Sequence, residues 1–172
     1  MVNEYENYGG CEIHVAMLRH GLAKQGVQTA LVTKYQDATK QKQGGDYKSL
    51  VEAMEKFRPD VVHLHNVGAF TATLSYVVGM EIPHVLSLHD YWPFCPLRMM
   101  ILNRHACQQP CGENCYPARK AGDTTRELVL AARARVTFNE GSAAIFRQHG
   151  IPVEVIPHGL DLELYKPAPM KK

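Results

Sequence analysis

Residues 83–90 read Pro-His-Val-Leu-Ser-Leu-His-Asp, an apolar run that ends in two polar side chains, His89 and Asp90. A run of this length bounded by proline is typical of a buried strand. The same pattern occurs upstream, where residues 61–65 (VVHLH) precede Asn66. Because ligands of parallel α/β sheets bind beyond the carboxyl ends of the strands, both runs predict polar side chains at one edge of a sheet.

Strand and helix patterns alternate along the rest of the chain. Val2–Tyr5 is expected to be the end of a first strand that is truncated, because few residues precede Gly9 and Gly10. Such alternation implies right-handed crossovers, so the sequence predicts an α/β fold with a doubly wound, mostly parallel Rossmann-like sheet. Further strands are expected at residues 27–33, 136–138 and 153–156, and helices at 11–25, 46–57, 69–78, 123–134 and 141–149.

Composition excludes several classes of protein. The chain has 172 residues, of which 45% are hydrophobic, and this suits one domain with its own core. The formal charge is only +2 and no basic block occurs, which argues against a nucleic-acid partner. No apolar run approaches the roughly 20 residues that span a bilayer, and the N-terminus lacks the pattern of a signal peptide. The expected compartment is the cytoplasm.

Several polar residues are expected at the carboxyl edge of the sheet. Gly9 and Gly10 precede a helix, where backbone N–H groups can face an anion, although a Gly-Gly pair also suits a plain tight turn. His14 follows one helical turn later and faces either the same cleft or solvent. We expect His63 and His65 to point to opposite faces of their strand, with His65 lining the cleft and His63 in the core.

The segment from Leu86 to Cys115 ends in a cysteine-rich loop, which we interpret as an irregular insert. Four cysteines with the spacing C-x11-C-x3-C-x3-C offer a structural zinc site, whereas an iron–sulfur cluster, disulfides or plain thiols are the alternatives. Cys11, in the glycine loop, is expected to be an isolated small residue. The four candidate metal ligands are Cys95, Cys107, Cys111 and Cys115.

Four motifs in order resemble the N-terminal, acceptor-side domain of the family 4 (group 1) glycosyltransferases, which are two-domain GT-B enzymes. The resemblance covers essentially the whole chain. It implies transfer of a sugar from a nucleotide-sugar to an acceptor hydroxyl with retention of configuration, and a reaction that needs no bound divalent metal. The motifs are GGCEIH at 9–14, PDVVHLHN at 59–66, SLHDYWPFCP at 87–96 and VIPHGLDLELYKP at 155–167.

The resemblance also implies roles for individual residues. Gly9 and Gly10 match the loop that approaches the donor phosphates. His89 matches the histidine that faces the reacting sugar, where a neutral imidazole positions the donor sugar by a hydrogen bond. Asp90 either orients that imidazole or caps the turn after the strand. His158 stands where many family members have asparagine.

The remaining candidate residues would bind substrate. His14, His65 and Asn66 are expected in the cleft. Trp92, the only tryptophan, either stacks on a sugar ring of the acceptor or anchors the cysteine loop in the core.

Domain boundaries follow from the same resemblance. Residues 1–165 are expected to form the acceptor-side domain and residues 166–172 the tail or the start of an interdomain linker. The paired-glutamate motif that holds the nucleotide in family members does not occur in these residues, so the chain alone is expected to be inactive. Its partners would be the nucleotide-sugar, a glycan or lipid-linked acceptor at the inner membrane face, and the missing C-terminal domain.

Two other functions are compatible with the sequence. The first is a non-catalytic half-domain that binds glycans or complements a separate partner domain, with dimerisation through the exposed face of the cleft. The second is another kind of Rossmann nucleotide-binding protein. The absence of a G-x-G-x-x-G first turn argues against the second.

Overall fold

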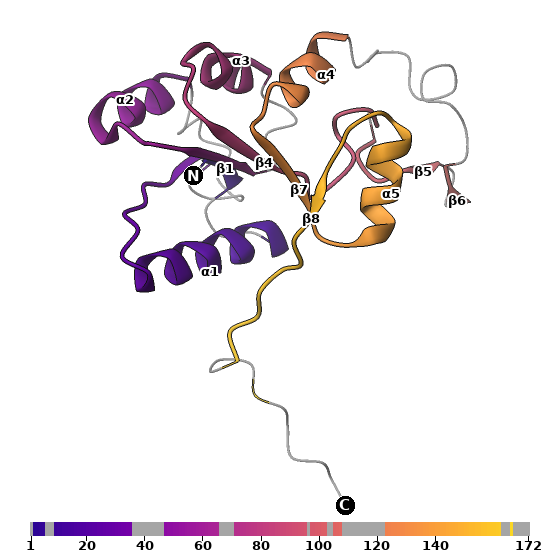
Figure 1. Cartoon of the computed structure of the whole chain (residues 1–172), viewed down its shortest axis with the longest axis horizontal. Coiled ribbons are helices and arrows are strands. Elements are labelled where there is room, and N and C mark those ends of the chain that lie inside the picture. Colours follow the sequence, from indigo (N-terminus) through magenta and orange to yellow (C-terminus); the bar gives the residue numbers. More distant parts are fainter. Residues whose placement is uncertain are drawn as a thin grey trace, which may run out of the picture.

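The structure is a computed structural model that describes residues 2–5, 9–35, 47–65, 71–95, 97–102, 105–107, 123–162 and 166. Six parallel strands form one sheet in the order β2-β1-β3-β4-β7-β8, and a separate antiparallel pair, β5 and β6, follows β4 along the chain (Figure 1). The strands are β1 (Val2–Tyr5), β2 (Val32–Tyr35), β3 (Val62–His65), β4 (His84–Ser87), β5 (Ile101–Leu102), β6 (His105–Ala106), β7 (Ala134–Thr137) and β8 (Glu154–Val155).

The order of the strands reverses at β1, which lies between β2 and β3. Val2 pairs with Val32 on one side and with Leu64 on the other. The chain therefore runs outward from β1 to β2 and then back across β1 to β3. In open parallel sheets the loops separate at such a reversal and leave room for a ligand at the carboxyl edge.

The described residues form five helices, which lie beside the sheet. Figure 1 shows α1 on one face and α2, α3 and α4 on the other. Gly26 adopts a φ of +76° just after α1, a conformation that favours glycine and ends the helix there, as the sequence predicts. Asn139 caps α5 by accepting a hydrogen bond from the Ser142 N–H at 2.8 Å. The helices are α1 (Gly10–Lys24), α2 (Tyr47–Phe57), α3 (Thr71–Gly79), α4 (Asp123–Leu130) and α5 (Glu140–Gln148).

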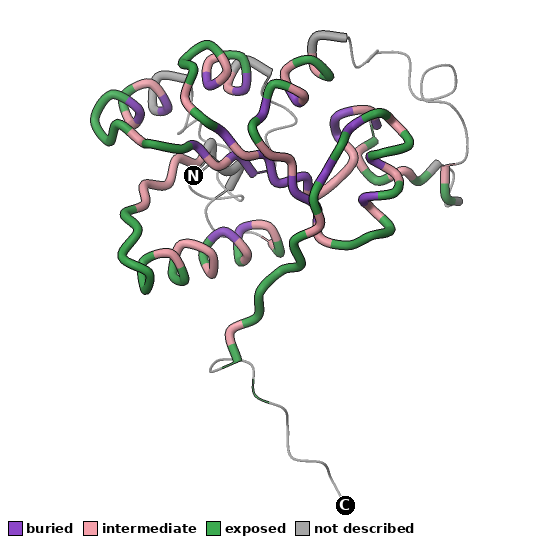
Figure 2. Tube along the Cα trace, in the orientation of Figure 1, coloured by how far each residue is buried: buried purple, intermediate pink, exposed green. Residues whose placement is uncertain are grey.

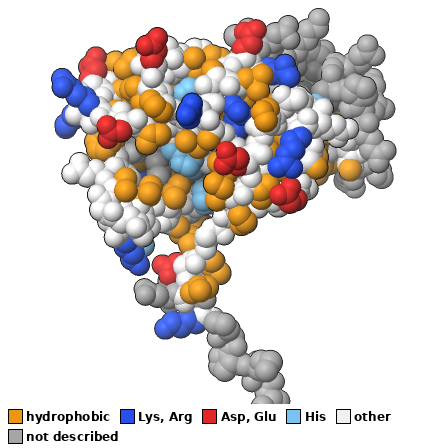
Figure 3. All heavy atoms as spheres, viewed as in Figure 1, with side chains coloured by type: hydrophobic (Ala, Val, Ile, Leu, Met, Phe, Trp, Pro, Cys, Tyr) orange, Lys and Arg blue, Asp and Glu red, His pale blue; other side chains and the backbone are white. Residues whose placement is uncertain are grey.

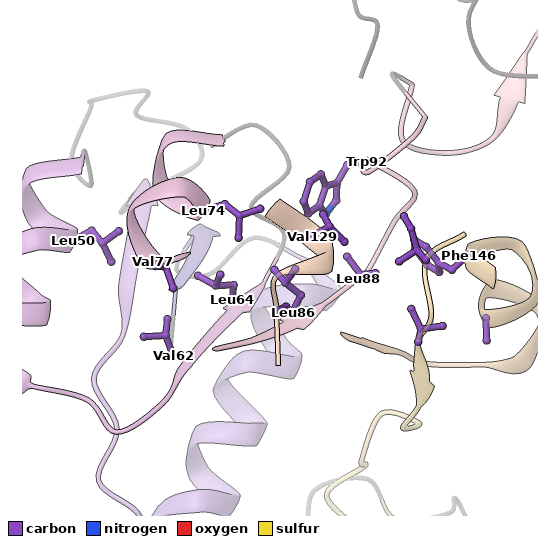
Figure 4. Close-up of a cluster of buried hydrophobic side chains, with 14 of the residues drawn as sticks. Leu50, Val62, Leu64, Leu74, Val77, Leu86, Leu88, Trp92, Val129 and Phe146 are labelled. Carbon is purple, nitrogen blue, oxygen red and sulfur yellow. The ribbon is translucent and has the colours of Figure 1, made fainter. Parts of the chain in front are cut away.

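The core lies between the central strands and the helices α2, α3 and α4. Leu64 of β3 pairs in register with Leu86 of β4, and both are almost fully buried. Leu74 and Val77, one turn apart on α3, pack on the same cluster, as the close-up in Figure 4 shows. Burial is concentrated on the central strands, whereas the outward sides of the helices are exposed (Figure 2). The alternation of strands with amphipathic helices explains this arrangement.

The β5–β6 pair lies in a segment expected to be irregular, β7 begins two residues earlier than expected, and two other elements differ more in extent. The strand expected at residues 27–33 begins only at Val32, since its first pairing partner on β1 is Val2. The helix expected to reach residue 134 ends at Leu130, where the Arg135 guanidinium binds the Leu130 carbonyl at 2.9 Å and the Ala132 carbonyl at 2.8 Å. The last carbonyl groups of a helix have no partner within the helix. A cationic side chain that binds them stabilises the end of the helix at that point.

No helix among the described residues is long and apolar enough to cross a membrane.

Candidate functional site

Four sheet strands and one helix direct their ends to the same edge of the fold. His65 is the last residue of β3, His89 follows β4 by two residues, and Phe138 follows β7. The N-terminus of α1 contributes His14, and the segment after β8 contributes His158. We call the five imidazoles the histidine cluster: His14, His63, His65, His89 and His158.

The histidine cluster is held together by short nitrogen contacts. Nδ1 of His65 lies 3.1 Å from Nε2 of His89, and Nδ1 of His14 lies 2.8 Å from Nδ1 of His158. The His14 ring centroid is 5.7 Å from that of His65 and 5.6 Å from that of His89. Residues separated by up to 144 positions therefore meet at one point, as the parallel topology requires.

The expectation that His63 and His65 point to opposite faces of the strand is wrong. Their ring centroids lie 4.0 Å apart, side by side. Side chains alternate along a strand with a period of two, so residues i and i+2 share a face. His63 also forms a hydrogen bond with the neighbouring strand β4, where its Nε2 lies 2.8 Å from Oγ of Ser87. His65 is the more deeply placed of the two and is completely buried.

Burial holds the imidazoles of the cluster in their neutral forms. Burial, followed by the neighbouring His158, lowers the pKa of His14 to about 4. The pKa of His63 is lowered to about 4 and that of His89 to about 3, in both cases mainly by burial. Burial is also the main cause that lowers the pKa of His65 well below 6.5. At neutral pH the cluster therefore offers uncharged donors and acceptors.

Phe138 closes the cluster from the β7 side. Its ring stacks on His158 with centroids 3.6 Å apart and 17° between the planes, and lies 4.6 Å from the His89 ring. Sequence reasoning did not single out Phe138. Its position directly after a strand, which also marks His89, is the signal that would have found it.

The glycine loop lies at the N-terminus of α1, as predicted. Gly9 is the N-cap residue and accepts a hydrogen bond from the Ile13 N–H at 3.0 Å. A side chain at Gly9 would crowd the Glu12 carboxylate, since a Cβ there would lie 3.2 Å from Oε2, whereas a Cβ at Gly10 would meet nothing within 4 Å. The first turn thus combines open backbone at Gly10 with a buried acidic side chain, Glu12.

Asp90 makes the contacts of a turn residue. Its Oδ1 accepts a hydrogen bond from the Trp92 N–H at 2.9 Å, and its Oδ2 pairs with the Arg98 guanidinium at 2.8 Å. Of the two roles considered for Asp90, this geometry corresponds to the cap of the turn after β4. Among the described residues, no contact joins its carboxylate to the His89 ring.

Trp92 lies in the core. Only 7% of it is exposed, and it belongs to the same cluster of buried side chains as Leu88 and Phe146 (Figure 4). The structure therefore gives Trp92 the role of a core anchor, and in this conformation its ring offers no face for stacking on a sugar.

The structure describes only part of the cysteine set. Cys95 is buried, with its N–H bonded to the Tyr91 carbonyl at 2.7 Å, and Cys107 is half-buried beside the β5–β6 pair. Cys111 and Cys115 lie outside the described residues, as does Asn66. The zinc site predicted for the four cysteines stays a prediction.

Cys11 lies closer to the histidine cluster than the sequence suggested. Sγ of Cys11 and one ring nitrogen each of His65 and His89 all lie within 4.8 Å of one another. The expectation that Cys11 is an isolated small residue is therefore wrong. Its position in the first turn of α1, beside the glycine loop, places it at the carboxyl edge of the sheet.

Comparison with known protein families gives a match over most of the chain. The sequence model of Glycosyltransferase Family 4 matches residues 8–164. The match includes every described residue of the histidine cluster and the glycine loop. No curated protein matches the chain significantly.

Proposed function

The chain belongs to glycosyltransferase family 4, and we propose that it forms the acceptor-side domain of a GT-B enzyme that transfers a sugar from a nucleotide-sugar to an acceptor hydroxyl. The proposed reaction retains the anomeric configuration. A second Rossmann-like domain, facing the carboxyl edge of this sheet, would hold the nucleotide.

The observation that carries the proposal is the placement of His89 at the carboxyl edge. Its imidazole is kept neutral by burial and is fixed by His65, whose Nδ1 lies 3.1 Å from Nε2 of His89. No described residue bonds Nδ1 of His89, so that nitrogen remains for a hydroxyl of the donor sugar. A neutral, oriented imidazole positions the sugar, while the attacking hydroxyl passes its proton directly to the departing phosphate.

His65 serves the site through His89. Because His65 is completely buried, it orients the His89 ring and does not reach a substrate. His14 is half-buried and close to both rings, so it is the second imidazole that we propose to contact a sugar. Asn66 keeps its proposed role as a substrate-binding residue on sequence grounds alone.

The donor phosphates are proposed to approach the N-terminus of α1 at Gly10. Backbone N–H groups and the helix dipole favour an anion there. The buried Glu12 carboxylate in the same turn opposes a second negative charge. Because the helix N-terminus attracts the phosphates and the Glu12 carboxylate repels them, we expect phosphate binding to this half of the cleft to be weak. Glu12→Gln should strengthen that binding.

Exposed apolar side chains support the presence of a partner domain. Ile13 on α1 is 54% exposed, and Leu160 and Leu162 after β8 are 58% and 74% exposed. Figure 3 shows hydrophobic side chains along the segment that leaves the body of the fold. A surface of this kind also suits a non-catalytic half-domain that complements a separate partner, which is the second candidate function.

Calorimetric titration of the chain with a panel of nucleotide-sugars and glycans tests the proposal. We expect binding of at least one sugar ligand, weakened about tenfold or more by His89→Ala. His20→Ala, at an exposed histidine on α1, is the matched control and should bind like the wild type. Absence of binding to every sugar ligand, or equal binding by His89→Ala, would contradict the proposal.

A transfer assay separates the two candidate functions. The chain is mixed with a bound nucleotide-sugar and a glycan acceptor, and the product is examined by mass spectrometry. We expect no transfer by this domain alone; transfer that is lost in His89→Ala would overturn that expectation and identify a catalytic domain. Sugar binding without transfer, together with a measurable dimer or partner complex, favours the half-domain that complements a partner.

The cysteine set is proposed to hold a structural zinc ion. Cys95 is anchored in the core and Cys107 follows the β5–β6 pair, so an ion shared by them would fix the intervening hairpin. Substitution of Cys107 with serine should then release zinc without altering the binding of sugar ligands. Protein that carries no zinc when purified without chelator would contradict this part.

A further inference from the structure

Three side chains from three different elements converge beside the glycine loop. Cys11 lies in the first turn of α1, His65 ends β3, and His89 follows β4. One ligand atom from each lies within 4.8 Å of the other two. The parallel sheet and the first crossover fix these positions, so the group is preassembled by the fold.

The separation of the two imidazoles fits a metal ion. Nδ1 of His65 and Nε2 of His89 lie 3.1 Å apart. Two nitrogens bound to one tetrahedral zinc ion at about 2.0–2.1 Å would lie about 3.3 Å apart, and a thiolate at about 2.3 Å would lie about 3.5 Å from each. The nitrogens need almost no movement to reach this arrangement, and the thiol sulfur must come closer to the nitrogens by at most about 1.3 Å, the difference between 4.8 Å and about 3.5 Å.

Burial gives a second indication that the group can take a ligand. His65 is completely buried, and its Nε2 has no hydrogen-bond partner among the described residues. Because Nδ1 of His65 faces His89, Nδ1 is the nitrogen placed to bind an ion, and the ring proton then lies on Nε2. Such a residue is stabilised by a ligand that uses its lone pair.

The donor set determines the kind of ion. One thiolate and two imidazoles are borderline or soft ligands, which suit Zn²⁺ and similar transition ions, whereas Mg²⁺ and Ca²⁺ prefer oxygen. We propose that Cys11, His65 and His89 form a binding site for a zinc-like transition-metal ion at the carboxyl edge of the sheet. Three protein ligands leave a fourth position open, and His14, 5.6 Å from His89 between ring centroids, borders it.

Binding releases one proton, because the Cys11 thiol must lose its proton to form the Zn–S bond. No electron is transferred. The site differs from the set of four cysteines proposed for structural zinc, with which it shares no residue. It does not depend on the proposed transferase function either, since binding of the ion is measured without any sugar.

Zinc content after equilibration and gel filtration provides the first test. The wild-type chain should retain one more zinc per chain than Cys11→Ser, whatever the other four cysteines contribute. His20→Gln, an exposed histidine on the same helix, should retain as much as the wild type. Equal zinc contents in the wild type and in Cys11→Ser would overturn the proposal.

A residue-specific measurement provides the second test. The first Lys or Arg of the chain is Arg19, so trypsin releases residues 1–19 with Cys11 as the only cysteine. Zinc, but not magnesium, should slow iodoacetamide alkylation of this peptide about tenfold or more in the folded chain. The protection should disappear in His89→Gln and persist in His20→Gln. Protection that persists in His89→Gln would exclude the proposed ligand set.

Discussion

The backbone N–H of Trp92 donates a hydrogen bond to Oδ1 of Asp90 across 2.9 Å, while Oδ2 of the same carboxylate pairs with Arg98. Asp90→Asn keeps an oxygen acceptor and loses only a partly exposed ion pair, so it should lower the free energy of unfolding by less than about 1 kcal/mol. Asp90→Ala also leaves the Trp92 N–H without its acceptor, and should cost about 1 to 3 kcal/mol. Urea denaturation measures both values.

The same variants distinguish the two roles predicted for Asp90. If Asp90 closes the turn, the ¹⁵N chemical shifts of the His89 imidazole should be the same in the wild type and in Asp90→Ala. A changed tautomer of His89 in Asp90→Ala would instead assign Asp90 to the orientation of that ring.

The single tryptophan reports directly on its own environment. With 7% of Trp92 exposed, its fluorescence should be blue-shifted and protected from iodide quenching in the folded chain. Saturating amounts of a sugar ligand should leave the emission unchanged, because the ring lies in the core. A change in emission that follows sugar binding would revive the prediction that Trp92 stacks on the acceptor.

Truncation of the core should be costly at α3. Leu74 is 1% exposed, and Leu74→Ala should lower the free energy of unfolding by roughly 2 to 5 kcal/mol through lost burial and a residual cavity. Ser75→Ala, at the exposed neighbouring position, should change it by about 0.5 kcal/mol or less. Similar values for the two variants would contradict the packing of α3 on the sheet.

Acid should destabilise the fold through the histidine cluster. Burial lowers the pKa of His63 to about 4 and that of His89 to about 3, against 6.5 for an ordinary histidine. The unfolded chain then binds more protons than the folded chain below pH 6.5, so stability is complete above this value and decreases as the pH falls toward 4. The loss is at most about 1.4 kcal/mol per pH unit for each of these histidines.

Urea unfolding at several pH values between 4.5 and 8, with a chelator present, measures this slope. His63→Gln should reduce it, whereas His20→Gln should not. A free energy of unfolding that is constant between pH 7 and pH 5 would show that the buried imidazoles take up protons without cost.

Much of the fold could be predicted because local and long-range signals agree. Apolar runs ending in His65 and in His89 predicted two strands of one parallel sheet, and the structure shows that they are neighbours, with His65 paired to Ser87 in register. The glycine at position 26 predicted the end of α1, and the structure gives Gly26 the positive φ that a helix end of this kind requires. The extent of β2 was not predictable in this way, because a strand begins where its partner strand begins, and that depends on the register with Val2.

The candidate site was predicted in position but not in composition. Placement after a strand identified His65 and His89, whereas the pairing of His14 with His158 depends on a segment 144 residues later crossing the N-terminus of α1. The face of His63 was misjudged through an error in strand periodicity, which the ring contact with His65 corrects. The sequence left two roles for Trp92, stacking on a sugar or anchoring the core, because hydrophobicity alone does not distinguish a core side chain from a sugar-binding one.

The segment after β8 that carries His158 leaves the sheet after a last backbone hydrogen bond, from the Ile156 N–H to the Thr137 carbonyl at 2.9 Å. Beyond that bond, His158 stacks on Phe138, makes a nitrogen contact with His14, and lies 5.7 Å from His89 between ring centroids. An aromatic pair contributes about 0.5–1.5 kcal/mol, far less than the core strands do. Displacement of residues 157–160 therefore requires only a small fraction of the free energy of unfolding, and the entrance to the cluster can open on a much shorter timescale than the sheet beneath it.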